Sequence, residues 1–256
     1  MKRIALITGA TSGIGEATAL LLARNDFNVI LTGRRYDLLK KVRKKIESET
    51  NSKVIELCFD IRKHSEVLQA LDVIPDDWKK IDVLVNNAGL AAGLDHIQEG
   101  NLDDWEQMID TNIKGLLYIT REISKWMIMN GSGHIINIGS IAGKEVYEKG
   151  NVYCATKFAV DALTRGMRID LVQHNIKVTC IAPGMVETEF SLVRFKGDRE
   201  RAAKVYEGLT PLHAEDIAEA ILFTVTRPPH VNINEILIMP TVQASATIVH
   251  RKPSDS

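Results

Sequence analysis

Short apolar runs alternate with longer amphipathic stretches along the whole chain. The runs are rich in Val, Ile and Leu without polar alternation, which is typical of strands covered on both faces. They predict strands at Arg3–Thr8, Asn28–Thr32, Lys53–Phe59, Ile81–Asn86, His134–Gly139, Lys177–Ala182 and Ile233–Met239. Apolar positions at helical spacing predict helices at Gly15–Asn25, Tyr36–Thr50, Ser65–Leu71, Trp105–Asn130, Val152–His174 and Glu215–Thr226. This alternation predicts an α/β fold, with one doubly wound parallel sheet and helices on both faces.

The pattern continues from end to end without a linker. No internal repeat, low-complexity tract or Pro/Gly/Ser-rich stretch marks a boundary, so we expect a single domain over residues 1–256. The region 186–212 fits no strand, and we expect it to form a short lid inserted before the last helix. Residues 240–256 would form a C-terminal tail. The charged stretch Tyr36–Thr50 is interpreted as a solvated helix face rather than a nucleic-acid patch.

Charge and composition narrow the function classes. The 256 residues carry 32 Lys and Arg against 33 Asp and Glu, which gives a net charge of −1. Without a basic excess the chain offers no footprint for a phosphate backbone, so we expect no nucleic-acid partner. Cys58, Cys154 and Cys180 are scattered without a C-x-x-C pair, and the histidines lack zinc-binding spacing. We therefore expect no metal site, and a reducing compartment, the cytoplasm.

The N-terminus imitates a targeting signal only in part. Lys2 and Arg3 precede an apolar run, Ile4–Ile7, that Thr8 interrupts after four residues. A secretory signal needs roughly 7–15 apolar residues, and a membrane span needs about 18. We therefore expect neither a signal peptide nor a membrane partner.

A glycine-rich turn lies between the first predicted strand and the first predicted helix. It reads Thr8-Gly9-Ala10-Thr11-Ser12-Gly13-Ile14-Gly15, with the spacing G-x-x-x-G-x-G. Glycines let the chain turn sharply and let backbone N–H groups approach a pyrophosphate at a helix N-terminus. The turn therefore predicts a Rossmann-type dinucleotide site. We expect its cofactor contacts to come from Gly9, Thr11, Ser12, Gly13, Ile14 and Gly15.

The end of the second strand indicates which dinucleotide binds. An acidic residue there would hydrogen-bond the ribose hydroxyls of NAD and repel a 2′-phosphate. Gly33 stands in that place and is followed by Arg34 and Arg35. Guanidinium groups suit a phosphate dianion in charge and in geometry, so we expect NADP as the cofactor. The alternative is that both arginines are ordinary surface charges.

Further motifs follow in a fixed order. They are Asn86-Asn87-Ala88-Gly89, then Asn112, Ser140, Tyr153-x-x-x-Lys157 and Pro183-Gly184. Tyr153 and Lys157 are four residues apart, which places both on one helix face. With the glycine turn, this set resembles the short-chain dehydrogenase/reductase family from Lys2 to about Met239.

The resemblance implies a catalytic role for four residues. Tyr153 would move the proton of the substrate hydroxyl, Ser140 would hold the same oxygen, and Lys157 would bind the nicotinamide ribose. Asn112 would anchor a water that links Lys157 to solvent. A free tyrosine has a pKa near 10, and we expect the Lys157 ammonium and the oxidised cofactor to lower the pKa of Tyr153. The resemblance also implies cofactor contacts from Asp60, Ile61, Asn86, Ala88, Gly89, Pro183, Gly184, Val186 and Thr188, besides Tyr153 and Lys157.

Three stretches are similar to one subgroup, the NADP-dependent 3-hydroxy acid dehydrogenases, also described as serine or L-allo-threonine dehydrogenases. They are Leu102–Arg121, Ile181–Gly197 and Pro229–Gln243. That similarity implies a small 3-hydroxy acid or 3-oxo acid as substrate and a homotetramer.

A substrate carboxylate entering a partly dry cleft needs a cation. We expect this cation to be Arg194, with Lys196 and Lys144 as competing candidates and a plain surface charge as the alternative. Tyr147 lies in the segment expected to line the substrate mouth.

Other functions remain open on the same scaffold. One is a broad-specificity carbonyl reductase or a 3-oxoacyl carrier-protein reductase, although no cationic patch for an acidic carrier is evident. Another is a non-enzymatic NADP(H) sensor, which the presence of both Tyr153 and Lys157 disfavours. A sugar epimerase or dehydratase would carry a different glycine spacing.

Overall fold

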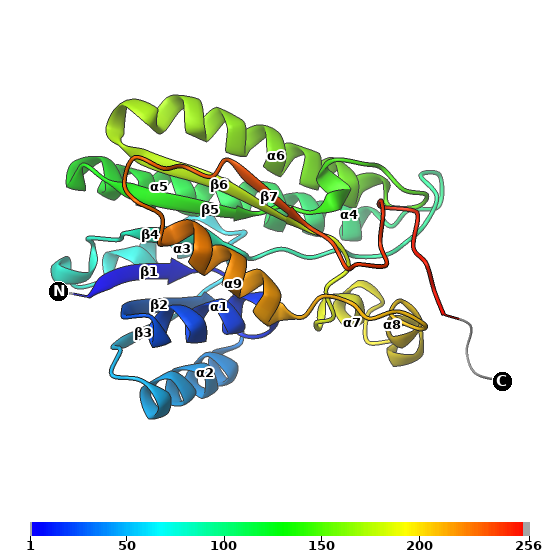
Figure 1. Cartoon of the computed structure of the whole chain (residues 1–256), viewed down its shortest axis with the longest axis horizontal. Coiled ribbons are helices and arrows are strands. Elements are labelled where there is room, and N and C mark those ends of the chain that lie inside the picture. Colours follow the sequence, from blue (N-terminus) through cyan, green and yellow to red (C-terminus); the bar gives the residue numbers. More distant parts are fainter. Residues whose placement is uncertain (1, 253–256) are drawn as a thin grey trace.

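The computed structural model describes residues 2–252 and contains one seven-stranded parallel sheet (Figure 1). The strand order is β3-β2-β1-β4-β5-β6-β7, so the winding reverses between β1 and β4. All seven strands lie within or next to the runs predicted from the sequence, which confirms the doubly wound α/β fold. The strands are β1 (Arg3–Ile7), β2 (Phe27–Gly33), β3 (Val54–Cys58), β4 (Val83–Asn86), β5 (Gly133–Ile138), β6 (Ile176–Pro183) and β7 (Glu235–Ile238).

Alternate side chains of each strand enter two separate apolar layers. In β1, Ala5 and Ile7 pack into one layer, while Ile4 and Leu6 pack into the other. Helices α1 (Gly13–Arg24), α2 (Tyr36–Glu49) and α9 (Ala214–Val225) cover the first layer. Helices α3 (His64–Asp72), α5 (Leu116–Asn130) and α6 (Asn151–Leu171) cover the second. Figure 1 shows α5 and α6 together on the side of the sheet away from α1 and α2.

The helix predicted over Trp105–Asn130 differs most from the structure. It begins earlier, as α4 (Leu102–Ile109), and a π-helical turn at Asp110–Gly115 separates α4 from α5. Asn101 caps the N-terminus of α4, because its side chain accepts a hydrogen bond from the amide of Asp104 at 3.0 Å. A π turn leaves the apolar period almost unbroken, which is why the sequence pattern predicts one continuous helix.

The segment 186–212 crosses the carboxyl end of the sheet. It contains two short helices, α7 (Phe190–Arg194) and α8 (Arg199–Lys204), and a parallel bridge joins its ends, Val186 and Leu212. The tail beyond β7 runs back beside this segment, where Lys252 donates a backbone hydrogen bond to Gly208. Residues 253–256 of the predicted tail lie outside the described part of the chain. Within residues 2–252, no helix combines the length and the apolar character that crossing a bilayer requires.

Candidate active site

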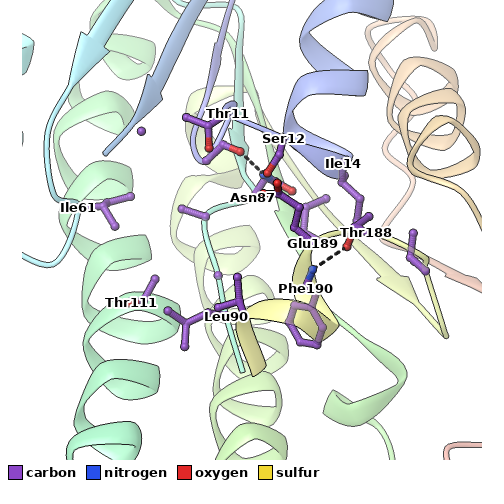
Figure 2. Close-up of a pocket in the computed structure, with 18 of the residues that line it drawn as sticks. Thr11, Ser12, Ile14, Ile61, Asn87, Leu90, Thr111, Thr188, Glu189 and Phe190 are labelled. Atoms are coloured by element: carbon purple, nitrogen blue, oxygen red, sulfur yellow. Dashed lines mark hydrogen bonds between the residues drawn. The ribbon is translucent and has the colours of Figure 1, made fainter. Parts of the chain in front are cut away.

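A cleft of about 420 Å³ opens at the carboxyl ends of the strands, where the winding reverses (Figure 2). Open α/β sheets bind ligands at this kind of switch point. Most of the predicted site residues line the cleft: Gly9, Thr11, Ser12, Gly13, Ile14, Arg34, Arg35, Asp60, Ile61, Ala88, Gly89, Ser140, Tyr153, Lys157, Pro183, Gly184, Val186 and Thr188.

The glycine turn forms the floor of the cleft. Gly9 has a φ of +65°, a backbone conformation that residues with a Cβ rarely adopt. The Thr8 hydroxyl accepts hydrogen bonds from the amides of Asn87 at 3.0 Å and Ala88 at 2.9 Å. These bonds join the turn to the loop after β4. The first amides of α1 have no helical carbonyl partner, so this end of the helix is suited to an anion.

Gly15 and Asn86 differ from the expectation, because neither lines the cleft. A Cβ on Gly15 would collide with the carbonyl of Gly9, so this glycine permits the turn to pack on α1. Asn86 is the last residue of β4 and points into the core, where its amide donates to Thr120 at 2.8 Å and to Asn137 at 2.9 Å. Asn87, the next residue, lines the cleft in its place.

Two arginines line the cleft beside the glycine turn. Arg34 is exposed and borders the cleft. Arg35 donates to the hydroxyls of Thr11 and Ser12, both at 2.7 Å, and to the Glu189 carboxylate at 2.8 Å. The Arg35 guanidinium thus lies against the glycine turn.

Asp60 and Ile61 form the wall beside these arginines. Burial acts to raise the pKa of Asp60, but hydrogen bonds from Arg62 outweigh it and hold that pKa below its usual value. The Arg62 guanidinium contacts both carboxylate oxygens, with an Nε–Oδ2 distance of 2.9 Å. Asp60 is therefore an anion fixed in place, and both Asp60 and Ile61 line the cleft.

Tyr153 and Lys157 project into the other end of the cleft from successive turns of α6. Tyr153 is buried among Leu90, Ala142 and Phe190, and its ring lies 5.6 Å from that of Phe190. Burial raises the pKa of Tyr153, while a hydrogen bond with Ser140 lowers it. The protein groups alone therefore do not produce the lowered pKa expected from the sequence, because the cost of burying a tyrosinate exceeds what they supply.

Lys157 is buried behind the tyrosine. Its Nζ donates to the carbonyl of Ile138 at 2.9 Å and lies 6.0 Å from the centre of the Tyr153 ring. Burial lowers the pKa of Lys157 to about 8. The lysine is mainly protonated at neutral pH, but it can lose its proton within a small pH range above that.

Asn112 lies behind the cleft rather than on its wall, and the π turn positions it. Its carboxamide accepts from the amide of Leu90 at 2.9 Å and donates to the carbonyl of Leu90 at 2.8 Å. It also donates to the Thr156 hydroxyl at 3.0 Å, which in turn donates to the Tyr153 carbonyl. Asn112 therefore connects the loop after β4 to the helix that carries Tyr153.

A second, small hollow adjoins Tyr153 and contains Arg194. Arg194 and Gly93 bond reciprocally: the Arg194 Nε donates to the Gly93 carbonyl at 3.2 Å, and the Gly93 amide donates to the Arg194 carbonyl at 3.1 Å. The guanidinium carbon lies 5.5 Å from the ring centre of Tyr147 and 5.7 Å from that of Tyr153. One terminal nitrogen, Nη2, is buried without a hydrogen-bond partner among the described residues.

Sequence reasoning missed several residues of the cleft. Gly33 and Asn87 belong to motifs of the sequence, but the motifs alone predict no cofactor contact for them. Nothing in the local sequence distinguishes the others, because they reach the cleft only through the fold. The missed residues that line it are Thr32, Gly33, Phe59, Asn87, Leu90, Thr111, Ile138, Gly139, Glu189, Phe190 and Val193.

The fold and this cleft define a class of dinucleotide-dependent oxidoreductases, and comparison with known proteins agrees. A family model described as short chain dehydrogenase matches residues 3–198. The chain therefore belongs to the short-chain dehydrogenase family, as the motifs indicated.

Relatives with names cover nearly the whole chain. An NADP-dependent 3-hydroxy acid dehydrogenase of Salmonella typhi is 46% identical over 97% of this chain and 99% of its own. A protein of the same name from Schizosaccharomyces pombe is 41% identical over 96% of both chains. A solved structure, the closed form of a serine dehydrogenase complexed with NADP⁺, superposes with a TM-score of 0.90. It is 43% identical and covers 97% of this chain and 100% of that one.

Proposed function

We propose that this protein is an NADP-dependent dehydrogenase that oxidises a small 3-hydroxy acid or reduces the matching 3-oxo acid. The observation that carries the proposal is the position of Arg194, whose buried and unpartnered nitrogen lies beside the ring of Tyr153. A cation next to the proton-transfer group fits a substrate that carries a carboxylate near its hydroxyl. The names of the relatives support the same substrate class.

The cleft fits a dinucleotide phosphate along its length. The amides at the start of α1 and the Gly9 turn would hold the pyrophosphate, and Arg34 and Arg35 would hold the 2′-phosphate. The wall of Asp60 and Ile61 would contact the adenine. When bound, the nicotinamide cofactor supplies the acceptor or donor of the hydride.

Proton movement falls to the groups around Tyr153. The Tyr153 hydroxyl would remove the proton of the substrate alcohol during oxidation and return it during reduction. Ser140, which lines the cleft with Tyr153, would hold the same oxygen in position. The Lys157 ammonium stabilises negative charge on Tyr153, and Asn112 fixes the helix turn that carries both.

Arg194 is favoured over the two other candidate cations because both of those are neutralised. Lys196 is paired with Asp104 at 2.9 Å, and Lys144 is paired with Asp161 at 2.5 Å and Glu235 at 2.8 Å. Among residues 2–252 the Arg194 guanidinium has no carboxylate partner; it donates to the Gly93 carbonyl and contacts the rings of Tyr147 and Tyr153. Tyr147, whose ring contacts the Arg194 guanidinium, would then help to hold that guanidinium in the substrate pocket.

The test compares serine with an uncharged short-chain alcohol in the Arg194→Ala variant. A hydrogen bond to a charged group is worth about 1.5–3 kcal/mol, so kcat/KM for serine should fall roughly 10–150-fold. Activity on the alcohol should be spared. Arg199→Ala, which removes an exposed arginine of α8, is the matched control.

Three results would contradict the proposal. An equal loss on serine and the alcohol would mean that Arg194 only shapes the pocket. Retained activity on both would remove its role altogether. Faster turnover of a carrier-bound thioester than of the free acids would indicate a 3-oxoacyl carrier-protein reductase instead.

We further propose a homotetramer of single-domain subunits, in which the segment 186–212 closes over the substrate as a lid. Exposed apolar side chains on α5 and α6, such as Leu117, Phe158 and Ile169, support association. The cytoplasm is the proposed compartment, in keeping with Cys58, Cys154 and Cys180, which are all free thiols.

A further inference from the structure

Arg35 has an anionic partner that comes from a distant part of the chain. Its Nη1 donates to the Glu189 carboxylate at 2.8 Å, although the two residues are 154 positions apart. The other edge of the guanidinium, Nε and Nη2, faces the hydroxyls of Thr11 and Ser12. A single arginine thus joins the glycine turn to the segment 186–212.

Glu189 itself borders the cleft. It immediately precedes α7, and Figure 2 shows it next to Ser12, whereas the ring of its neighbour Phe190 points away from Ser12. Hydrogen bonds from Arg35 and Ser12 hold the pKa of Glu189 below its usual value, so the side chain is an anion at neutral pH. A fixed negative charge therefore stands within the group that would receive the 2′-phosphate.

We propose that Glu189 determines cofactor affinity by competing with the 2′-phosphate of NADP(H) for Arg35. The inference rests on the proposed function, in which Arg34 and Arg35 hold that phosphate. A phosphate dianion placed against Arg35 is repelled by the Glu189 carboxylate, and it gains the full charge of the guanidinium only when the carboxylate withdraws. NAD(H) has no phosphate at this position and leaves the Arg35–Glu189 pair undisturbed.

The solvent exposure of Arg35 and Glu189 sets how strongly Glu189 can compete with the 2′-phosphate. The side chains of Arg35 and Glu189 are 47% and 49% exposed, and pairs this open to water are weak and sensitive to salt. The pair therefore does not prevent binding of the phosphate. Its removal should raise the affinity for a 2′-phosphorylated ligand about two- to fivefold at low ionic strength.

The test measures binding by calorimetry with two fragments of the cofactor. Adenosine 2′,5′-bisphosphate carries the phosphate in question, and adenosine 5′-monophosphate lacks it. Glu189→Gln should bind the bisphosphate about two- to fivefold more tightly than the parent, with the monophosphate unchanged. The gain should shrink at high salt. Glu187→Gln, an exposed carboxylate of the same segment outside the cleft, is the matched control and should change neither ligand.

Unchanged or weaker binding of the bisphosphate to Glu189→Gln would overturn the inference, and so would an equal gain for both ligands. Arg35→Ala separates this failure from that of the proposed function. If Arg35→Ala leaves the affinity for the bisphosphate unchanged, Arg35 does not bind the phosphate and the cofactor contacts themselves must be reassigned. In the Arg35→Ala background the effect of Glu189→Gln should largely disappear, and a full gain there would also overturn the competition.

Discussion

The groups around Tyr153 decide when its hydroxyl can give up a proton. Its hydroxyl lies in an apolar pocket that opposes ionisation, while the hydrogen bond with Ser140 and the charge of Arg194 act in the other direction. A buried acid of this kind transfers its proton only when the reacting groups are in place. Burial therefore keeps the Tyr153 hydroxyl protonated when no substrate and cofactor are bound.

Replacement of Tyr153 by Phe should remove turnover and leave the cofactor bound. The phenyl ring preserves the packing against Phe190 and deletes only the group that moves the proton. Since acid–base groups contribute roughly 10²–10⁴-fold, kcat should fall by at least that factor. Steady-state kinetics measure the loss, and fluorescence titration with NADPH checks binding. Near-native kcat in this variant would exclude Tyr153 as the proton-transfer group.

At this scale the sequence predicted which residues gather, but not every direction in which they point. Tyr153 and Lys157 share a helix face by spacing alone, and the glycine turn follows from a strand and a helix on either side of it. Asn86 and Asn87 are adjacent, and only the register of β4 decides that Asn86 enters the core. The Arg35–Glu189 pair was beyond reach, because its two residues meet only through the tertiary fold.

At the scale of elements, the interior of the sheet contains a buried histidine, near the amino end of β5, that joins two strands. His134 in β5 contacts the Thr179 hydroxyl of β6 at 2.8 Å, and that hydroxyl donates to the Ile233 carbonyl at 2.6 Å. Because Thr179 has only one proton to give, the His134 Nε2 must be the donor. Its Nδ1 is buried without a partner among the described residues. Burial, with Lys177 and Arg3 nearby, lowers the pKa of His134 to about 3.

This histidine should make the protein less stable in acid. The pKa of His134 is lower in the folded protein than its usual value near 6.5, so the unfolded chain binds the extra proton between those two pH values. The free energy of unfolding should therefore fall as pH drops from about 6.5 toward 3, by at most roughly 1.4 kcal/mol per pH unit from this residue. Urea denaturation at several pH values measures the slope. His134→Gln, which retains a donor but does not titrate, should flatten it, and an unchanged slope would contradict the prediction.

Strands and helices were predicted well where the spacing of apolar residues fits only one of the two. Strands buried on both faces read as continuous apolar runs, and this recovers all seven. The helices α7 and α8 were missed because each has fewer than two turns, too few for a helical period to emerge. The π turn was missed for the opposite reason, since the apolar period continues through it.

At the scale of the whole molecule, the two long helices α5 and α6 leave an apolar face uncovered. Phe158 and Ile169 are 41% and 74% exposed, and their spacing of 11 residues places them on one side of α6. Val172, which follows the last residue of α6, is 68% exposed. Apolar side chains concentrated on one face of a helix mark a surface suited to association. The proposed tetramer would use this face in at least one of its interfaces.

A charge placed on that face should weaken association. Ile169→Asp would bury a carboxylate in the interface, and sedimentation velocity should show it shifted from the tetramer toward smaller species. Val73→Asp changes an equally exposed apolar residue at the end of α3, away from α6, and serves as the control. A parent protein that sediments as a monomer would refute the tetramer. A tetrameric Ile169→Asp would show that the interfaces lie elsewhere.

The π turn at Asp110–Gly115 also constrains how this chain can change in length. A π turn holds more residues than an α turn, so a chain shorter by one residue here would run from α4 into α5 as an ordinary helix. The faces of α4 and α5 would keep their directions, because the deletion removes only the residue by which the π turn exceeds an α turn. The side chains inside the turn would shift instead, and Asn112 would leave Leu90. A homologue that is one residue shorter between Leu102 and Asn130 should therefore keep the fold and lose the Asn112 contacts, and counting this stretch is a quick check on whether a distant homologue retains the same site.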